Sequence, residues 1–144
     1  MKLTTKGRYG LKAMVDIAME YGISSVSIAA LAQLQGISEP YLEQIIASLK
    51  KAGLVAATRG AQGGYSLTRA PELISVLDIL SVLEGTTLVD CVSSERVDCE
   101  NACSCSARPV WLKLQQKIND VLSSTTLKDM TDDYKIQTEW VKNQ

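Results

Sequence analysis

The stretch SIAALAQLQGISEPYLEQIIASLKKAG at residues 27–53 decides the fold. Ser27 and Ser38 each precede apolar residues at helical spacing, which predicts two helices with serine N-caps. Gly36-Ile37-Ser38 forms a short turn between them, and Gly53 is placed as a left-handed stop after the second helix. Two helices joined by a short turn that contains glycine are typical of a helix-turn-helix unit.

The residues that follow predict a β-hairpin. Residues 54–59 and 65–68 are short extended runs, and the glycine-rich segment 60–64 lies between them. A hairpin directly after a helix-turn-helix unit is a wing.

Helices are also predicted on both sides of this unit. Residues 5–21 show apolar residues at helical spacing, and Ser75-Val-Leu-Asp78 is a capping box that opens a helix to about Glu84. Residues 109–123 predict the best helix of the C-terminal half, and a short helix is expected at 127–133. The apolar residues of the 109–123 helix form a seam typical of two paired helices: Trp111, Leu114, Ile118 and Val121.

The predicted fold class is therefore mainly α with a small β-hairpin wing, a winged helix-turn-helix plus a long dimerisation helix. We divide the chain into a DNA-binding winged helix-turn-helix domain at 1–85, a cysteine-rich loop at 86–107, dimerisation helices at 108–133 and a loosely held tail at 134–144.

The composition excludes several classes of function. The chain has 144 residues, 46% of them hydrophobic, and no histidine. A Ser-His-Asp triad, histidine metal ligands and an imidazole pH switch are therefore excluded, and we expect no enzyme. The net charge of −1 is unevenly divided: residues 1–70 hold eight Lys and Arg against four Asp and Glu, whereas residues 71–144 hold seven against twelve. Phosphate binding needs local positive potential, so we expect any nucleic-acid-binding surface to lie in the N-terminal half.

The sequence also predicts a compartment. The N-terminus lacks the apolar region of a signal peptide, and no stretch approaches the roughly 18 apolar residues of a membrane span. We therefore expect a cytoplasmic protein with no membrane partner. Thiols stay reduced in the cytoplasm, so the four cysteines are interpreted as metal ligands or redox sensors before disulfides.

The helix at residues 39–52 is the candidate recognition helix, with Leu42, Ile45, Ile46 and Leu49 facing inward. Such a helix presents its N-terminal residues to base edges in the major groove. Gln44 can pair with adenine, and Glu43 can accept from the cytosine amino group while repelling phosphate. Ser38 and Tyr41 can reach phosphate oxygens. The full set of candidate DNA contacts in this helix and its turn is Ser38, Glu39, Pro40, Tyr41, Glu43 and Gln44.

The wing and the first helix add further candidates. An arginine at the base of the wing suits a narrow minor groove rich in A·T pairs, and glycines let the backbone approach DNA closely. The candidates are Arg59, Gly60, Gly63, Gly64 and Tyr65 in the wing, with Lys6 and Arg8 in the first helix. Two other interpretations stay open: an ordinary solvated face, and a winged helix that binds a protein.

All four cysteines lie close together, at Cys91, Cys99, Cys103 and Cys105. Structural zinc sites usually show paired Cys-x2–4-Cys knuckles, and this segment has one tight pair. Iron–sulfur clusters are held by thiolates on irregular loops. The spacing alone leaves open a cluster, a zinc site, a thiol switch and inert thiols.

Four motifs resemble those of the IscR/CymR/NsrR family of bacterial winged-helix transcription regulators: MKLTTKGRYGL at 1–11, ISEPYLEQ at 37–44, GLV at 53–55 and RGAQGGY at 59–65. The resemblance covers about residues 1–130. It is strongest to the IscR branch, which regulates iron–sulfur cluster assembly, because Cys105 follows Cys99 by six residues and precedes Trp111 by six, as in that branch. The nitric-oxide-sensing branch has an acidic ligand where this chain has Arg8, and the cysteine-metabolism branch lacks the cysteine loop.

The resemblance implies a [2Fe–2S] cluster held by Cys91, Cys99 and Cys105. The usual fourth ligand is a histidine at the position of Arg108, which is a cation and cannot ligate iron. Cys103 is the favoured replacement. The alternatives are a carboxylate from Glu95, Asp98 or Glu100, and an exogenous ligand.

These expectations describe a homodimeric regulator of transcription that represses cluster-assembly genes when clusters are plentiful. Two copies joined by the 109–123 helices read a pseudo-palindromic operator in double-stranded DNA, and the cluster-assembly machinery is the expected cluster donor. The competing interpretations are a zinc-binding winged-helix regulator and an electron carrier built around the cluster.

Overall fold

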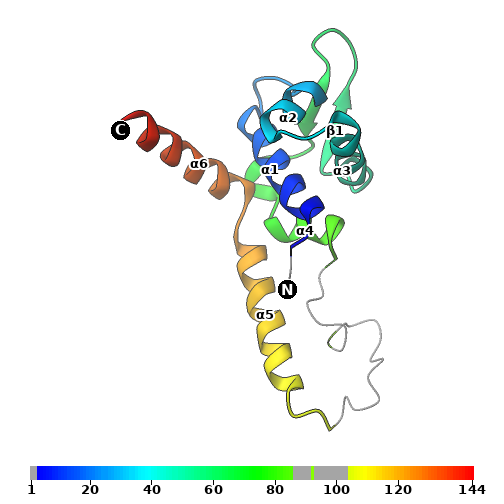
Figure 1. Cartoon of the computed structure of the whole chain (residues 1–144), viewed down its shortest axis with the longest axis vertical. Coiled ribbons are helices and arrows are strands. Elements are labelled where there is room, and N and C mark those ends of the chain that lie inside the picture. The colour runs from blue at the N-terminus through cyan, green and yellow to red at the C-terminus, as the bar shows by residue number, and fades with distance from the viewer. Residues whose placement is uncertain (1–2, 86–91, 93–103) are drawn as a thin grey trace.

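The computed structural model describes residues 3–85, 92 and 104–144, and Figure 1 shows how their elements are arranged. The first three helices and the hairpin follow the predicted order. A 3-10 helix, η1 (Pro71–Leu73), then leads into α4 (Val76–Leu83). We call the part formed by α1 to α4, η1 and the hairpin the head; its other elements are α1 (Thr5–Met19), α2 (Ile28–Gln35), α3 (Glu39–Lys51), β1 (Val55–Thr58) and β2 (Gly64–Leu67).

Hydroxyl caps start the helices where the sequence predicts them. The Ser27 hydroxyl accepts the Ala30 N–H at 3.1 Å, and the Ser38 hydroxyl accepts the Tyr41 N–H at 3.4 Å. Ser75 forms the predicted capping box at the start of α4. Gly53 ends the α3 segment with a φ of +78°, as its left-handed position predicts. The predicted winged helix-turn-helix fold is confirmed.

The inner face of α3 occupies the centre of the core. All four residues predicted to face inward, Leu42, Ile45, Ile46 and Leu49, are 0% exposed. They pack against the buried face of α1, which includes Ala13, Met14 and Ile17.

Two large apolar residues near the ends of α1 and α2 are exposed. Tyr21 follows the end of α1 and is 44% exposed, and Leu34 at the end of α2 is 67% exposed. They lie outside the core because α1 ends before Tyr21 and α2 buries only Leu31 and Ala32.

Two glycines of α1 form a notch that receives the end of α4. Gly7 and Gly10 are buried. A Cβ atom on Gly10 would overlap the Leu83 side chain, and one on Gly7 would overlap the Glu84 carboxylate. The absence of side chains at both positions therefore lets the last turn of α4 approach α1 closely.

Two helices, α5 (Arg108–Ser124) and α6 (Leu127–Lys142), extend from the head (Figure 1). No residue of α5 is buried, and α5 meets the head at α4. The predicted 109–123 helix is confirmed within one residue at each end. None of the described helices is long and apolar enough to cross a membrane.

The C-terminal helix is longer than the sequence predicts. The expectation of a short 127–133 helix followed by a loose tail was wrong, since α6 continues to Lys142 without a glycine or proline to interrupt it. Its first part packs on α1 and η1, and its distal part exposes Ile136, Trp140 and Val141.

A short backbone bridge ties the end of α5 to the start of α4. The Val76 N–H donates to the Thr125 carbonyl at 2.9 Å, and the Leu127 N–H donates to the Ile74 carbonyl at 2.9 Å. This bridge brings Leu127 into the core of the head, where it is 0% exposed. The core therefore includes a residue beyond the predicted boundary at residue 85.

Candidate functional site

The outer face of α3 lies next to the hairpin on one side of the head (Figure 1). Glu39, Pro40, Glu43 and Gln44 are exposed there. The side chains of Glu39, Glu43 and Gln44 make no hydrogen bond or ion pair within residues 3–85 and 104–144. Ser38 caps the helix with its oxygen, so its hydroxyl proton can still be donated to a ligand. These polar groups are therefore available to a partner.

Tyr41 has a second role that the sequence does not predict. Its ring packs against the ring of Tyr9, with centroids 6.5 Å apart and planes at 87°, an edge-to-face pair. The Lys12 ammonium lies 5.5 Å from the Tyr9 ring centre. The pair joins α1 to the start of α3, so these helices present their polar residues as one surface. The phosphate contact of Tyr41 stays a prediction.

The wing is shaped by glycines that serve the protein itself. Gly60 has a φ of +115°, which side chains rarely adopt. A Cβ atom on Gly63 would overlap the Thr58 carbonyl, and one on Gly64 would come within 2.5 Å of Val26. The fold of the hairpin itself therefore requires glycine at these three positions. The predicted close approach of these glycines to DNA stays a prediction.

The base of the wing is anchored to the loop before α2. The Val26 N–H donates to the Tyr65 carbonyl at 2.9 Å, and the Tyr65 N–H donates to the Val26 carbonyl at 2.8 Å. Arg59 is exposed at the end of β1. The bridge fixes the hairpin relative to the helix-turn-helix, so Arg59 and α3 keep a defined spacing.

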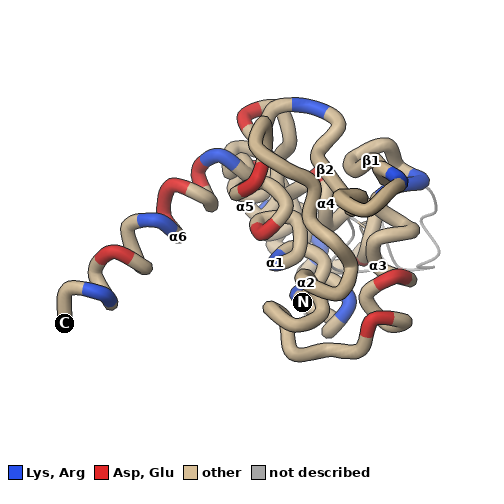
Figure 2. Tube along the Cα trace, turned by 90° about the horizontal axis from the view of Figure 1, so that it is seen from above, with Lys and Arg blue, Asp and Glu red and all other residues tan. Residues whose placement is uncertain are grey.

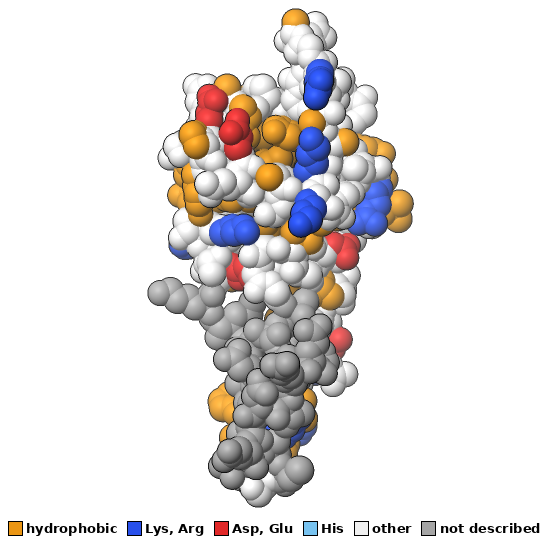
Figure 3. All heavy atoms as spheres, turned by 90° about the vertical axis from the view of Figure 1, so that its right-hand side faces the viewer, with side chains coloured by type: hydrophobic (Ala, Val, Ile, Leu, Met, Phe, Trp, Pro, Cys, Tyr) orange, Lys and Arg blue, Asp and Glu red, His pale blue; other side chains and the backbone are white. Residues whose placement is uncertain are grey.

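Basic side chains gather on this face of the head. Figure 3 shows Lys and Arg side chains that run down from the top of the upper body and lie at both of its sides, with acidic side chains at the upper left and others lower down. In Figure 2 the hairpin carries basic colour near β1, and α3 carries acidic colour. The acidic residues of α3 are Glu39 and Glu43. The exposed basic residues of the head are Arg8, Lys12, Lys50, Lys51, Arg59 and Arg69, and Lys6 is partly buried. These residues supply positive charge that phosphate binding needs, while Glu39 and Glu43 add negative charge on the outer face of α3.

Glu84 is a residue that the sequence analysis missed. Its Oε1 atom accepts the Thr4 N–H at 2.6 Å and the Thr4 hydroxyl at 2.7 Å. The Thr4 oxygen also accepts the Gly7 N–H at 3.2 Å and thereby caps α1. The carboxylate therefore lies at the positive end of α1, next to the candidate phosphate contacts Lys6 and Arg8. No local pattern could have found it, because Thr4 and Glu84 are 80 positions apart.

Of the four cysteines, the structure describes Cys105. Its thiol is free and partly buried, and its carbonyl accepts the Arg108 N–H at 3.3 Å, just before α5. The other predicted ligands, Cys91, Cys99 and Cys103, lie outside the described residues, as do the alternatives Glu95, Asp98 and Glu100. Within residues 3–85, 92 and 104–144, no three side chains of His, Cys, Asp or Glu are grouped to hold a metal.

The predicted dimer residues lie along α5. Trp111, Leu114 and Val121 are 37%, 43% and 62% exposed, and Ile118 is partly buried. An apolar seam on a helix with no buried residue is a surface that a partner would cover.

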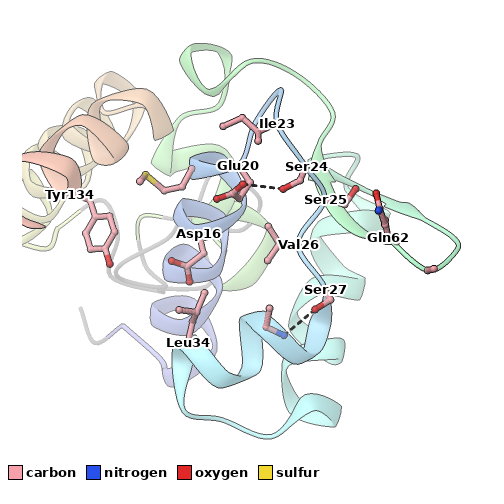
Figure 4. Close-up of a pocket in the computed structure, with 14 residues that line it drawn as sticks. Asp16, Glu20, Ile23, Ser24, Ser25, Val26, Ser27, Leu34, Gln62 and Tyr134 are labelled. Atoms are coloured by element: carbon pink, nitrogen blue, oxygen red, sulfur yellow. Dashed lines mark hydrogen bonds between the residues drawn. The ribbon is translucent and has the colours of Figure 1, made fainter.

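A cavity of about 820 Å³ opens between the end of α1, the loop before α2, the wing and α6 (Figure 4). The Ser24 hydroxyl donates to the Glu20 carboxylate at 3.0 Å at its edge, and Tyr134 of α6 lies across from them. Of the residues that we predicted to bind DNA, Gly63 alone lines it. The cavity is therefore separate from the exposed face of α3.

Asp16 lines this cavity and a neighbouring one of about 560 Å³. Burial raises the pKa of the Asp16 carboxyl, and the hydrogen bond from Gln35 and the charge of Lys12 oppose that rise. The other amide atom, Gln35 Oε1, is buried and has no partner among the described residues.

We expect Asp16→Asn to raise the melting temperature at about pH 7 by about 2–4 °C, for a gain of about 1 kcal/mol. The amide removes the cost of burying a charge and offers a donor beside Gln35 Oε1. A raised folded-state pKa means that the wild type loses stability as the pH rises through that pKa, whereas the variant does not. Calorimetry at about pH 4 and pH 7 should show a larger gain at the higher pH. An equal gain at both values contradicts the charge argument.

The chain is similar to known transcriptional regulators. The model of the Rrf2 family, described as an iron-dependent transcriptional regulator, matches residues 3–133. The HTH-type transcriptional regulator CymR of Bacillus subtilis is 40% identical over 131 residues, which cover 90% of this chain and 89% of CymR. The HTH-type transcriptional regulator IscR of Vibrio vulnificus is 37% identical over 137 residues, which cover 94% of this chain and 80% of IscR.

Two solved structures are similar over nearly the whole chain. The structure of CymR, described as the global cysteine regulator of B. subtilis, has a TM-score of 0.77 and 41% identity, covering 92% of this chain and 97% of that one. The structure of T. potens IscR has a TM-score of 0.76 and 46% identity, covering 93% of this chain and 88% of that one.

Proposed function

Because the chain belongs to the Rrf2 family of winged-helix, DNA-binding transcription regulators, we propose that an iron–sulfur cluster on its cysteine-rich segment controls its DNA binding. The observation that carries this proposal is the donor set. Four thiols lie within residues 91–105, directly before α5, in a chain without histidine. The description of the family as iron-dependent supports it.

The residues present fit such a group. Thiolates are soft ligands that suit iron, and we assign the cluster to Cys91, Cys99 and Cys105 with Cys103 as the fourth ligand. Cys105 precedes α5 by three residues, and the positive end of a helix stabilises an anionic group by about 0.3–1 kcal/mol. When bound, a [2Fe–2S] cluster supplies a redox-active centre and holds its thiolate ligands together.

The exposed face of α3 and the wing form the proposed DNA-reading surface. We place the start of α3 in the major groove, where Gln44 and Glu43 meet base edges, and the wing with Arg59 at the minor groove. Lys6 and Arg8 at the start of α1 are placed against phosphates. The exposure of Arg8, Glu43, Gln44 and Arg59 and the anchored wing support this arrangement.

The proposed assembly is a homodimer joined along α5. The seam of Trp111, Leu114, Ile118 and Val121 needs a partner, and a second copy carries the same seam. A dimer presents two α3 helices and two wings, which suits a pseudo-palindromic operator. The cysteine segment precedes α5, so cluster binding can bias the spacing of the two heads. We place the targets among cluster-assembly genes, with the assembly machinery as cluster donor.

Metal analysis of anaerobically purified protein tests the cluster assignment. We expect a coloured protein with about two iron and two sulfide per chain, and loss of the visible band in Cys105→Ala. Cys103→Ala should show the same loss if its thiol is the fourth ligand. A colourless wild type with stoichiometric zinc would falsify the cluster and favour a zinc-stabilised regulator.

A cysteine-metabolism regulator is the second candidate, because CymR matches this chain about as well as IscR does. This candidate predicts no bound metal and no dependence of DNA binding on iron. An electron carrier, by contrast, predicts reversible reduction with no sequence-selective binding to DNA.

We expect Gln44→Ala to weaken binding to a duplex selected by the wild type from a random pool, by about 1–3 kcal/mol. The loss should be confined to one base pair in each half-site, because Gln44 is exposed and holds no other residue in place. Repeating the selection with the variant measures this. The matched control is Lys50→Ala, a basic position at the other end of α3, which should weaken all sequences alike. Unchanged base preference in Gln44→Ala contradicts the assigned role.

A further inference from the structure

The junction between α4 and the cysteine segment is fastened to the start of α1. Glu84 caps the C-terminal end of α4, and its carboxylate accepts both the Thr4 N–H and the Thr4 hydroxyl. Gly85 then turns the chain with a φ of +79°, and the cysteine segment follows. The Glu84 carboxylate therefore fastens the last described residues before this segment to the start of α1.

The same carboxylate is linked to the backbone of the first turn of α1. The Gly7 N–H donates to the Thr4 oxygen, and the Thr4 hydroxyl donates to Glu84. Gly7 has no side chain at the point where Glu84 approaches, so the contact is as close as the backbone allows. Hydrogen bonds in a chain of this kind strengthen one another. Lys6 and Arg8 are the residues on either side of Gly7, so they belong to the turn that this network caps.

We propose that Glu84 is a positioning residue that couples the cysteine segment to the DNA-facing first turn of α1. The inference rests on the proposed function and names the route of its regulation. A change in the cysteine segment acts on the contact of Glu84 with Thr4 and loosens or tightens it. Lys6 and Arg8 move with the first turn, so their contacts with phosphate change.

This route differs from one through α5. The α5 helix follows the cysteine segment and sets the spacing of the two heads, whereas Glu84 precedes the segment and acts within one head. Removal of the Glu84 contact therefore cuts this route and leaves the α5 seam unchanged.

The test compares DNA affinity with and without the loaded cluster, in the full-length protein, on a duplex selected by the wild type from a random pool. In the wild type we expect the two affinities to differ by about 5- to 150-fold, a usual range for coupled sites. In Glu84→Ala the ratio should fall close to one. A general loss of packing lowers both affinities and leaves their ratio unchanged, so the ratio separates coupling from stability.

Matched variants keep the test decisive if Glu84→Ala folds poorly. Thr4→Asp keeps an N-cap for α1 but repels Glu84, whereas Thr4→Ser keeps both the cap and the donor. We expect Thr4→Asp to lose the coupling and Thr4→Ser to retain it. Glu84→Gln keeps an acceptor and should restore most of the ratio. The control Glu72→Ala removes an exposed carboxylate of η1 and should leave the ratio unchanged.

Retention of the cluster gives a second readout. Linkage requires DNA to slow the loss of the visible band in the wild type if the cluster tightens DNA binding, and this effect should vanish in Thr4→Asp. If the wild type shows the ratio and Glu84→Ala and Thr4→Asp keep it, the coupling role of Glu84 is wrong and the proposed function stands. If the wild type binds no cluster, or its ratio is one, the proposed function fails and this inference fails with it.

Discussion

We expect the replacement of Leu114 by aspartate to convert the proposed dimer to a monomer and to lower its affinity for DNA by about 10²- to 10⁴-fold, the gain that joining two binding modules provides. Leu114 lies in the middle of the α5 seam and is 43% exposed in the single chain. The substitution therefore costs the head little and places a charge at the centre of the proposed interface. Sedimentation analysis measures the mass, and fluorescence anisotropy measures affinity for the selected duplex.

The matched control is Gln116→Asp, an exposed residue on the opposite side of α5. It introduces the same charge two residues away, and helical geometry turns it from the seam. We expect a dimer with wild-type affinity. A Leu114→Asp protein that remains dimeric places the interface elsewhere, and a monomer with full affinity means that one head suffices for binding.

Ile45→Ala should reduce the free energy of unfolding by about 2–5 kcal/mol, the usual cost of such a truncation in a core. Ile45 is 0% exposed, and its side chain approaches the position where Gly10 lacks a Cβ atom. Its truncation leaves a void between α3 and α1, where neighbouring side chains cannot easily collapse. Urea unfolding followed by circular dichroism measures the change.

Leu34→Ala is the control for this truncation. Leu34 is also an aliphatic residue on a helix of the helix-turn-helix, but it is 67% exposed. We expect a change within about 0.5 kcal/mol, since surface substitutions rarely exceed that value. Similar decreases in the free energy of unfolding of the two variants would mean that burial in the head does not determine the size of the decrease.

The parts of the head that the sequence predicts depend on local rules. Ser27 and Ser38 cap their helices through residues three positions ahead, and the inward positions of α3 follow from the 3.6-residue period. The exposure of Glu43 and Gln44 follows from the same period. Their contacts with bases do not follow from it and remain predictions.

The features that the sequence did not predict depend on contacts between distant segments. Gly7 and Gly10 have a low helix propensity, so the sequence alone gives no reason for them in α1. The reason is the close packing of the end of α4 against them. The pairing of Tyr9 with Tyr41 requires the angle between α1 and α3, which no single helix encodes. The sequence predicts too short an α6 because the apolar residues of its distal part, Ile136, Trp140 and Val141, are exposed and give no core-facing pattern.

The position of Leu127 has a consequence for synthesis of the chain. Leu127 completes the core of the head, yet it follows α5 in the sequence and reaches its place by the bridge between residues 74–76 and 125–127. A ribosome must therefore release the whole of α5 before the head can close its core. The surface proposed to read DNA and the helix proposed to recruit a second subunit are therefore completed together. A nascent chain that stops before Leu127 lacks a residue of the core and the backbone bonds that join residues 125–127 to residues 74–76.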